Sequence, residues 1–573
     1  MPYSSFDRDI DGEKDNYNIL EFAGMDKILV NYGTKMGTIF PYCRDKLGRY
    51  AYTHFTYEQM NEESNRYAWG LVERGIKPGS KVLLLFPPSL EFTLIFATLF
   101  KIGAIPILID PGMGIRPMLK SIQSVEPDAF IGIPKAQLAR IFGRRYFKSV
   151  KLSITVGRRW FWRGPRLDQL RSDNSEQYPL YVNKRDDKAG IFFTTGSTGI
   201  PKGVIYTHIM FHTLMATVAD FFHLEEEAID MPAFPPFALF CMAYGGTSVI
   251  PEMDPTEPSK ADPKRLIQSI QDFGVTVSYG SPSIWGKVSK YCVENNITLP
   301  SMSRIIMFGA PVPGRILEEY SHVLPNGMTY TPYGSTEALF VCNITGKEVL
   351  EETWELSKQG KGTCVGYVVE GINLRIIKVI DEPITIPEGK SIEDFALPKG
   401  SIGEITVNGP YVTREYYNMP EKTKEGKIYD GDVLWHRMGD LGYVDEKERL
   451  WVVGRKSHRI TRDGKDYYTL INEAPFRNLD GVLRCAMVGV PCPKMGQRMV
   501  IILQLDKKNI PKSLKSKKNR LQVLNSLAKE KNIPVDAFLI FKKIPVDIRH
   551  NAKIKRNLLA ITAAKKLKGR FEA

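Results

Sequence analysis

The sequence predicts an α/β protein with a large N-terminal domain of two doubly wound sheets plus a β-subdomain, and a small mobile α+β C-terminal domain. Short aliphatic runs alternate with segments of helical length over residues 81–133 and again over 272–333, a rhythm typical of βαβ units. From about residue 364, strand patterns follow one another without helices. We expect one domain at 1–456 and the other at 457–573.

The elements are expected in the following order. In the first block, strands are predicted at 81–86, 104–109 and 129–133, with helices at 89–102 and 116–125. In the second block, strands are predicted at 275–279, 304–308 and 328–333, with helices at 283–295 and 314–323. The β-subdomain contributes strands at 372–380 and 402–407 around a loop at 381–400. The C-terminal domain contributes strands near 485–490 and 499–505, a lysine-rich loop at 507–520 and a helix at 521–529.

Composition places the chain among globular proteins. Of its 573 residues, 43% are hydrophobic and 25% are charged, which excludes disorder for most of the chain. Residues 1–15 lack the features of a signal peptide, and charged residues and prolines interrupt the most apolar stretch, 82–109, so no membrane span is expected. The seven cysteines are scattered and show no CxxC or zinc-like spacing. We therefore expect reduced thiols and a cytoplasmic location.

Basic residues concentrate in two places. The net charge is +14, and residues 457–573 hold 26 Lys and Arg against 9 Asp and Glu. This part resembles no nucleic-acid-binding module, so no nucleic-acid partner is expected. Residues 142–166 mix eight Lys and Arg with aromatic side chains. They are either a basic surface loop with its aromatics turned inward or a peripheral contact with anionic membrane or with an enzyme complex.

The strongest local signal is a loop at residues 193–203 between two predicted strands. Its glycines expose backbone N–H groups, its hydroxyl side chains add donors and Lys202 adds a cation, which together suit the phosphates of ATP. It differs from a Walker A loop because a strand, not a helix, follows it. The predicted ligands are Thr194, Thr195, Gly196, Ser197, Thr198, Gly199 and Lys202.

At these residues the chain resembles the adenylate-forming superfamily of acyl-CoA synthetases, luciferases and adenylation domains. Gly309-Ala310-Pro311 resembles the family segment beside the adenine, and the run from Tyr333 and Gly334 to Thr336 and Glu337 matches its YGxTE motif. The resemblance implies that Tyr333 stacks on adenine, that Thr336 contacts phosphate and that Glu337 holds Mg²⁺, a role that suits a carboxylate. It assigns Thr336 and Glu337 to catalysis.

Further motifs continue the resemblance along the chain. Asp440 lies in a segment similar to WxxTGD and is expected to bind both ribose hydroxyls, although Met438 replaces the usual Thr. Arg455 resembles the family arginine that reaches ribose and phosphate. Two positions later, Ser457 stands where the family has an Asp or Lys hinge.

The C-terminal motif is altered. It resembles PxTxxGKxxR, with two extra residues after Pro545 and with Ala552 in place of the glycine before Lys553, the expected catalytic lysine. Together with residues 234–239 and 456–459, this variant resembles the olefin β-lactone synthetases more closely than long-chain fatty acyl-CoA ligases.

An uncharged segment at 234–244 is expected to form the acyl pocket. The predicted substrate contacts are Phe234, Phe237, Ala238, Leu239 and Tyr244, with ordinary core packing as the alternative for each. We therefore expect ATP- and Mg-dependent activation of a long-chain, β-hydroxy fatty acid as acyl-AMP, followed by β-lactone closure. The alternative is a fatty acid–CoA ligase, which would use CoA, and a remoter one is an inactive nucleotide-binding scaffold.

Overall fold

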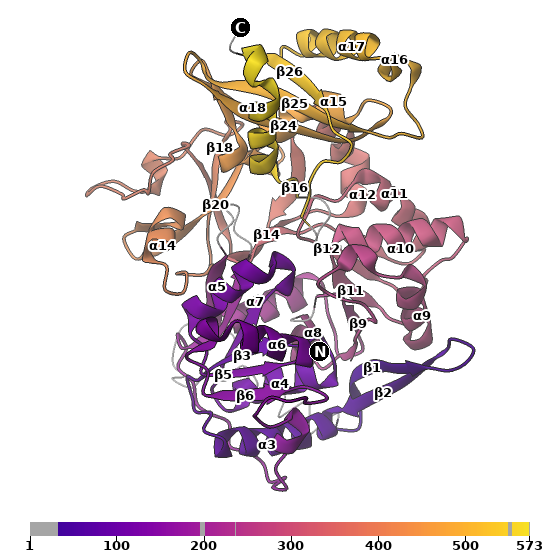
Figure 1. Cartoon of the computed structure of the whole chain (residues 1–573), viewed down its shortest axis with the longest axis vertical. Helices are drawn as coiled ribbons and strands as arrows, with labels where there is room; N and C mark the ends of the chain where they lie inside the picture. The colour runs from indigo at the N-terminus through magenta and orange to yellow at the C-terminus, as the bar shows by residue number, and fades with distance from the viewer. Residues whose placement is uncertain (1–32, 195–200, 235–236, 548–552, 572–573) are drawn as a thin grey trace.

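The computed structural model describes residues 33–194, 201–234, 237–547 and 553–571. The chain forms four sheets: the first two lie side by side at one end of the long axis, and the C-terminal sheet, in yellow, lies at the other end (Figure 1). Two of them are mainly parallel and carry helices, and a largely antiparallel region follows, which confirms the predicted α/β class. Among the described residues, no helix combines the length and apolar character that a membrane-spanning segment needs.

The first parallel sheet is buried on both faces. Its central strands are almost wholly apolar, as expected where helices cover both sides. The strand order is β6(Leu152–Thr155), β5(Ala129–Gly132), β3(Lys81–Leu85), β4(Ile105–Ile109), β7(Lys188–Thr194) and β8(Lys202–Thr207), with only β8 antiparallel to its neighbour. The associated helices are α3(Tyr57–Glu73), α4(Leu90–Lys101), α5(Ile115–Val125), α6(Pro134–Phe142) and α7(His208–Phe221).

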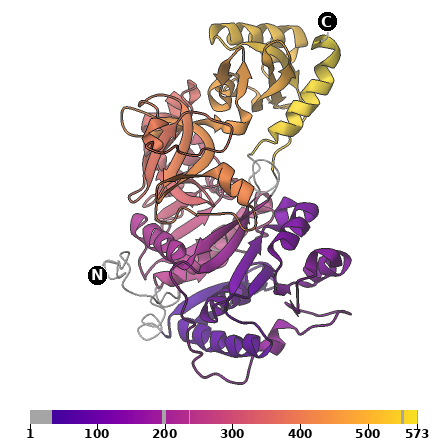
Figure 2. The same cartoon turned by 90° about the vertical axis from the view of Figure 1, so that its left-hand side faces the viewer.

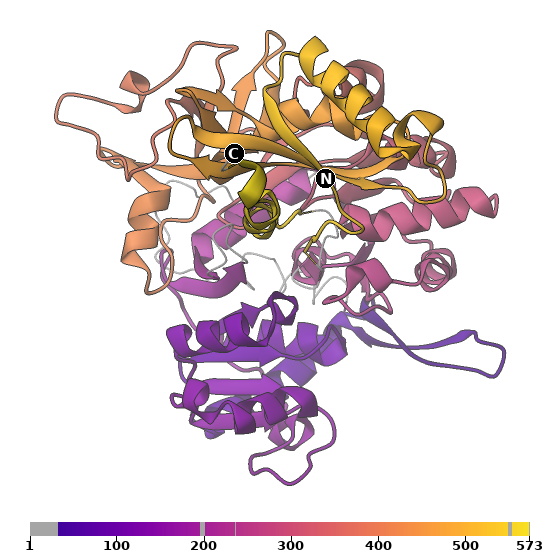
Figure 3. The ribbon, with the colours of Figure 1, turned by 45° about the horizontal axis from the view of Figure 1, so that its top comes forward.

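The second parallel sheet ends in an antiparallel hairpin. Its order is β13(Met328–Tyr330), β12(Arg304–Met307), β11(Val277–Gly280), β9(Ile229–Pro232), β10(Thr247–Val249), β1(Met36–Arg44) and β2(Tyr50–Thr56). Its helices are α8(Ala238–Ala243), α9(Pro263–Phe273), α10(Pro282–Glu294) and α11(Gly314–Val323). Hairpin β1–β2 projects beyond the body of the molecule in both Figure 1 and Figure 3.

The third sheet is antiparallel and follows the two parallel ones. Its path is β14(Tyr333–Ser335), β15(Ala338–Asn343), β16(Thr363–Val368), β21(Leu450–Arg455), β20(Val433–Val444), β18(Gly403–Asn408) and β17(Asn373–Ile377), with β19(Lys427–Asp430) also paired to β20. Its short helices are α12(Gly346–Glu348), α13(Trp354–Lys358) and α14(Pro420–Gly426).

The C-terminal sheet lies beyond the third one, at the yellow end of the molecule (Figure 2). Its order is β23(Lys465–Tyr467), β22(Ile460–Arg462), β25(Gly496–Leu505) and β24(Val482–Cys492), with β26(Val535–Ile540) also paired to β25. Its helices are α15(Thr469–Arg477), α16(Lys512–Lys515), α17(Lys517–Glu530) and α18(Arg556–Phe571). The predicted boundary between residues 456 and 457 falls just before this sheet and stays a prediction.

Three local predictions were wrong. Residues 142–166 are not one loop, because they contain edge strand β6, whose four residues are too few to show periodicity. The expected loop at 507–520 includes α16 and the start of α17. The single strand expected at 328–333 divides into β13 and β14, which belong to different sheets, because Pro332 lies between them and cannot donate to a ladder.

Candidate functional site

A cavity of about 2340 Å³ is lined by residues of all four sheets. Leu85, Met307, Asp440 and Cys485 represent the sheets in this lining. The predicted residues that line it are Thr194, Lys202, Phe234, Phe237, Gly309, Ala310, Pro311, Tyr333, Gly334, Thr336, Glu337, Asp440, Arg455 and Lys553. The predicted phosphate ligands Thr195, Gly196, Ser197, Thr198 and Gly199 lie outside the described residues. The fold thus brings distant motifs to one cavity.

Asp440 and Arg455 are paired by strand register. They lie directly opposite each other on β20 and β21, so their side chains share a face, and Arg455 Nη1 donates to Asp440 Oδ1 across 2.9 Å. The Tyr333 hydroxyl donates to the other carboxylate oxygen across 2.8 Å. The negative charge of Asp440 raises the pKa of Arg455 above its ordinary value, so the guanidinium stays charged. Each carboxylate oxygen keeps a free acceptor position, which suits ribose hydroxyls.

Glu337 lies at the turn between β14 and β15. Its carbonyl oxygen accepts from the backbone N–H of Thr413 at 2.9 Å, and the hydroxyl of Tyr206 donates to the carbonyl of Thr336 at 2.6 Å. These bonds position the Glu337 carboxylate, which accepts a 2.7 Å hydrogen bond from the hydroxyl of Tyr416.

The charge of Glu337 is set by its neighbours. Burial alone would raise the pKa of its carboxyl, but His436, the Tyr416 hydrogen bond, Lys427 and Lys202 together lower this pKa to about 2. Glu337 is therefore ionised at neutral pH. A hard anionic oxygen at this position is a suitable magnesium ligand.

Tyr416 connects Glu337 to the lysine of the phosphate loop. Its backbone pairs with Val204 of β8, and the N–H of Tyr417 donates to the carbonyl of Gly203, so this segment lies beside the strand that begins with Lys202. Lys202 Nζ donates to the Tyr416 hydroxyl at 3.3 Å and lies 4.4 Å from the ring centroid. Sequence analysis did not assign Tyr416 to the site.

Lys427 is a second group that sequence reasoning missed. Only 2% of it is exposed, and its ammonium donates to the carbonyl oxygen of Thr413, the residue whose N–H holds Glu337. Burial lowers the pKa of Lys427 to about 7, against the opposing attraction of Glu337. Nothing in the sequence around Lys427 indicates that this residue is buried. Its burial results from the packing of strand β19 against distant parts of the chain.

The donors fit a magnesium ion held jointly with phosphate. No described cluster of three or more His, Cys, Asp or Glu could hold a metal by protein ligands alone. Magnesium in nucleotide sites is commonly bound by one or two carboxylates together with phosphate oxygens. Glu337, with Lys202 beside it, matches that arrangement.

Lys553 reaches the same cavity from the C-terminal domain. Its N–H donates to Asp547 Oδ1 at 2.9 Å, and Val546 pairs with Ile554. Arg556, three positions on, also lines the cavity and donates to Glu473, with Nη2 and Oε2 3.2 Å apart. Both basic residues of the motif therefore lie at the cavity, and the arginine also links the start of α18 to α15.

Only two of the five residues predicted to contact the acyl group line the cavity. Phe234 and Phe237 line the cavity, and their rings lie 6.2 and 5.2 Å from that of Phe308. Ala238, Leu239 and Tyr244 are buried and do not line it, and the hydroxyl of Tyr244 donates to Asp230 at 3.1 Å. Phe240 lines the cavity instead. Helical periodicity could have identified Phe240 from the sequence, because residues 237 and 240 share a face of a helix.

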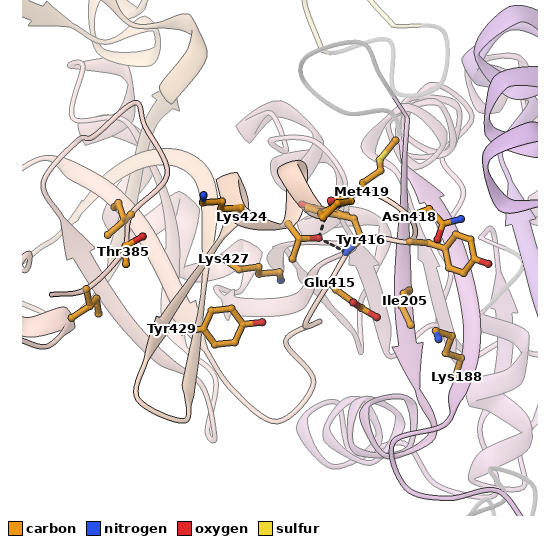
Figure 4. Close-up of a pocket in the computed structure, with 15 residues that line it drawn as sticks. Lys188, Ile205, Thr385, Glu415, Tyr416, Asn418, Met419, Lys424, Lys427 and Tyr429 are labelled. Carbon is orange, nitrogen blue, oxygen red and sulfur yellow. Dashed lines mark hydrogen bonds between the residues drawn. The ribbon is translucent and has the colours of Figure 1, made fainter. Parts of the chain in front are cut away.

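A smaller pocket of about 500 Å³ lies outside the predicted site (Figure 4). Lys188 and Ile205 of the first sheet form one side, and Lys427 and Tyr429 of β19 form the other. Tyr416 lines this pocket as well as the large cavity. It therefore forms part of the wall between the two.

The fold and the residues of the cavity suit a nucleotide-binding enzyme, and comparison with known proteins agrees. Residues 40–417 match the model of the AMP-binding enzyme family. The chain belongs to this family and is an adenylate-forming enzyme, as the motifs predicted.

Its relatives include an olefin beta-lactone synthetase of Stenotrophomonas maltophilia, which is 39% identical over 526 residues, covering 90% of this chain and 92% of the relative. A long-chain-fatty-acid–CoA ligase of Thermus thermophilus is 27% identical over 347 residues, covering 59% of this chain and 60% of the relative. Among solved structures, ATP-bound MatB from Rhodopseudomonas palustris shares the fold, with a TM-score of 0.73 at 20% identity over 97% of this chain and all of that one.

Proposed function

We propose that the protein activates a long-chain β-hydroxy fatty acid as acyl-AMP, using ATP and Mg²⁺, and then closes the acyl group to a β-lactone with release of AMP. The observation that supports this most is the meeting of Phe234 and Phe237, Glu337 and Lys553 in one cavity. The similarity to olefin beta-lactone synthetases over about nine tenths of both chains supports the second step.

In the first step, the fatty-acid carboxylate attacks the α-phosphorus of ATP and pyrophosphate leaves. Lys202 would neutralise the departing phosphates, Asp440 would hold the ribose, and Lys553 would bring the carboxylate and the α-phosphate together. Bound Mg²⁺ would supply further neutralisation of phosphate charge at Glu337. No protein nucleophile is needed.

In the second step, the β-hydroxyl oxygen of the substrate attacks its own acyl carbon. The new C–O bond closes a four-membered ring, the bond from the acyl carbon to the phosphate oxygen breaks, and AMP leaves with that electron pair. The hydroxyl proton passes to solvent. The cavity wall at Phe234 and Phe237 would hold the chain so that the hydroxyl lies close to the acyl carbon.

The alternative second step is attack by the thiol of CoA, and the fatty acid–CoA ligases among the relatives favour it. Both alternatives share acyl-AMP formation. The inactive scaffold is set aside, because the chain is an adenylate-forming enzyme.

The test is incubation of the purified enzyme with ATP, Mg²⁺ and a 2-alkyl-3-hydroxy fatty acid, with and without CoA, followed by mass spectrometry. We expect a product that lacks one water, formed without CoA, while a plain fatty acid stops at acyl-AMP. A product that requires CoA and forms equally well from the plain acid would establish the ligase alternative.

We also propose a cytoplasmic location, which the seven free cysteines support. Peripheral contact with a membrane is a separate proposal and rests on one surface loop.

A further inference from the structure

The loop that follows β6 exposes large aromatic side chains. In residues 157–164, here named the aromatic loop, Trp160 is 53% exposed and Phe161 is 73% exposed. Neighbouring aromatic side chains of this size with so much exposed surface mark a contact site more often than a plain protein surface. The mechanism proposed above uses neither residue.

The shape of the aromatic loop is held by its own contacts. Trp162 is buried beneath it, with its ring centroid 5.5 Å from that of Trp160 and 5.4 Å from that of Phe161. Trp162 Nε1 donates to Thr155 Oγ1 at 2.9 Å, and Arg159 donates to the carbonyl of Gly164 at 2.7 Å. The loop therefore presents its two exposed rings on an ordered base.

Gly164 closes the loop in a conformation that other residues avoid. Its φ is 109°, and a Cβ placed there would lie 2.2 Å from the carbonyl oxygen of Ser153. Gly164 thus fixes the backbone conformation at the end of the loop, and the contacts of Trp162 fix it at the base.

The charged residues of the aromatic loop are all positive. Arg158, Arg159 and Arg163 are exposed, and none of them forms an ion pair with a residue that the structure describes. Residues 142–166 contain no Asp or Glu, and the nearest acid along the chain, Asp168, is paired with Arg166 at 2.6 Å. Arginine beside tryptophan and phenylalanine matches an anionic interface, with cations for phosphate groups and rings for the acyl boundary.

The aromatic loop lies beside the apolar part of the large cavity. Strand β6 runs parallel to β5 at the edge of the first sheet, with Thr155 opposite Gly132, so the loop leaves at the carboxyl edge. Ile133, which follows Gly132, lines the cavity together with Ala136 and Ala139 of α6. A surface bound by this loop would lie near the region that accepts apolar groups.

We propose that the aromatic loop binds the surface of an anionic phospholipid bilayer, with Trp160 and Phe161 entering the interface and the three arginines contacting lipid phosphates. A bilayer is favoured over a protein partner because the apolar and the cationic contacts are both local to one short loop, as an anionic interface requires.

The test is co-sedimentation of the full-length enzyme with vesicles, without substrate or nucleotide, so that its outcome does not depend on the proposed reaction. Vesicles of phosphatidylcholine alone are compared with vesicles containing about one third phosphatidylglycerol. The variants are Trp160→Ala/Phe161→Ala and Arg158→Ala/Arg163→Ala. The control is Tyr42→Ala, since Tyr42 is equally exposed at 73% but lies in the projecting hairpin.

We expect binding to the anionic vesicles only, weakened about fivefold for each arginine removed and about tenfold or more without the two rings. Tyr42→Ala should bind as the wild type does, and all variants should keep wild-type circular dichroism and ATP–pyrophosphate exchange. Absence of wild-type binding, equal binding to both vesicle types, or equal binding by the loop variants would overturn the proposal. Loss of a defined protein complex in the loop variants, without vesicle binding, would assign the loop to a protein partner instead.

Discussion

The hydroxyl of Tyr416 donates a 2.7 Å hydrogen bond to the carboxylate of Glu337. The two residues are 79 positions apart, and the same hydroxyl accepts from Lys202, which is 214 positions from Tyr416. One phenol thus holds the proposed metal ligand and the phosphate-loop lysine in a fixed relation. It keeps two opposite charges close together while both face the cavity.

Replacing Tyr416 by phenylalanine is expected to reduce acid-dependent ATP–pyrophosphate exchange by about tenfold to a hundredfold, the value of a hydrogen bond to a charged group. The apparent requirement for Mg²⁺ should rise, because Glu337 loses a donor that orients it. Tyr417→Phe is the matched control, since the hydroxyl of Tyr417 contacts Lys81 instead. Equal effects of the two variants would contradict this role.

Replacing Asp440 by alanine is expected to raise the KM for ATP by about tenfold or more, because two hydrogen bonds to the ribose would be lost. The exposed Asp432, on the turn before β20, provides the control Asp432→Ala. Initial rates over a range of ATP concentrations measure the effect. An unchanged KM for ATP would remove Asp440 from the ribose site.

Lys553→Ala should lower ATP–pyrophosphate exchange by about two to three orders of magnitude, because it removes the charge that bridges carboxylate and phosphate. Consumption of a supplied acyl-AMP should persist. Lys565→Ala, at an exposed position of α18, controls for loss of positive charge. If both half-reactions fall together in Lys553→Ala, the lysine does not serve the first step alone.

Lys427 makes stability depend on pH. Burial lowers its pKa from the ordinary lysine value of 10.5 to about 7, so between these values the unfolded chain binds a proton that the folded chain does not. Folding stability should therefore rise with pH over this window, by up to about 1.4 kcal/mol per pH unit from this group, and below pH 7 the cost of burying the charge applies in full.

The variant Lys427→Met lacks this contribution. Its melting temperature, relative to the wild type, should be highest near pH 7 and should decline as the pH rises toward 10, as followed by differential scanning fluorimetry. Lys424→Met, at an exposed position in α14, should show no such trend. A difference between Lys427→Met and the wild type that does not change with pH would mean that Lys427 titrates normally.

The sequence alone determined the fold class, and it predicted the site residues that lie in short motifs. Alternating apolar runs predict parallel sheets because strand and helix periods are local, and Tyr333 with Glu337, or Gly309 with Pro311, can be assigned from a few adjacent residues. These assignments required no knowledge of the tertiary contacts between helices and strands.

The tertiary structure alone decided which groups meet. The register of β20 with β21 sets Asp440 against Arg455, the pairing of Tyr416 with Val204 carries its hydroxyl to Glu337, and the fold buries Lys427 beside Thr413. It also places Phe240 rather than Tyr244 at the cavity. The physical reason is that hydrogen bonds, burial and charge interactions act through space between strands far apart in the chain, and no local pattern of residues records that distance.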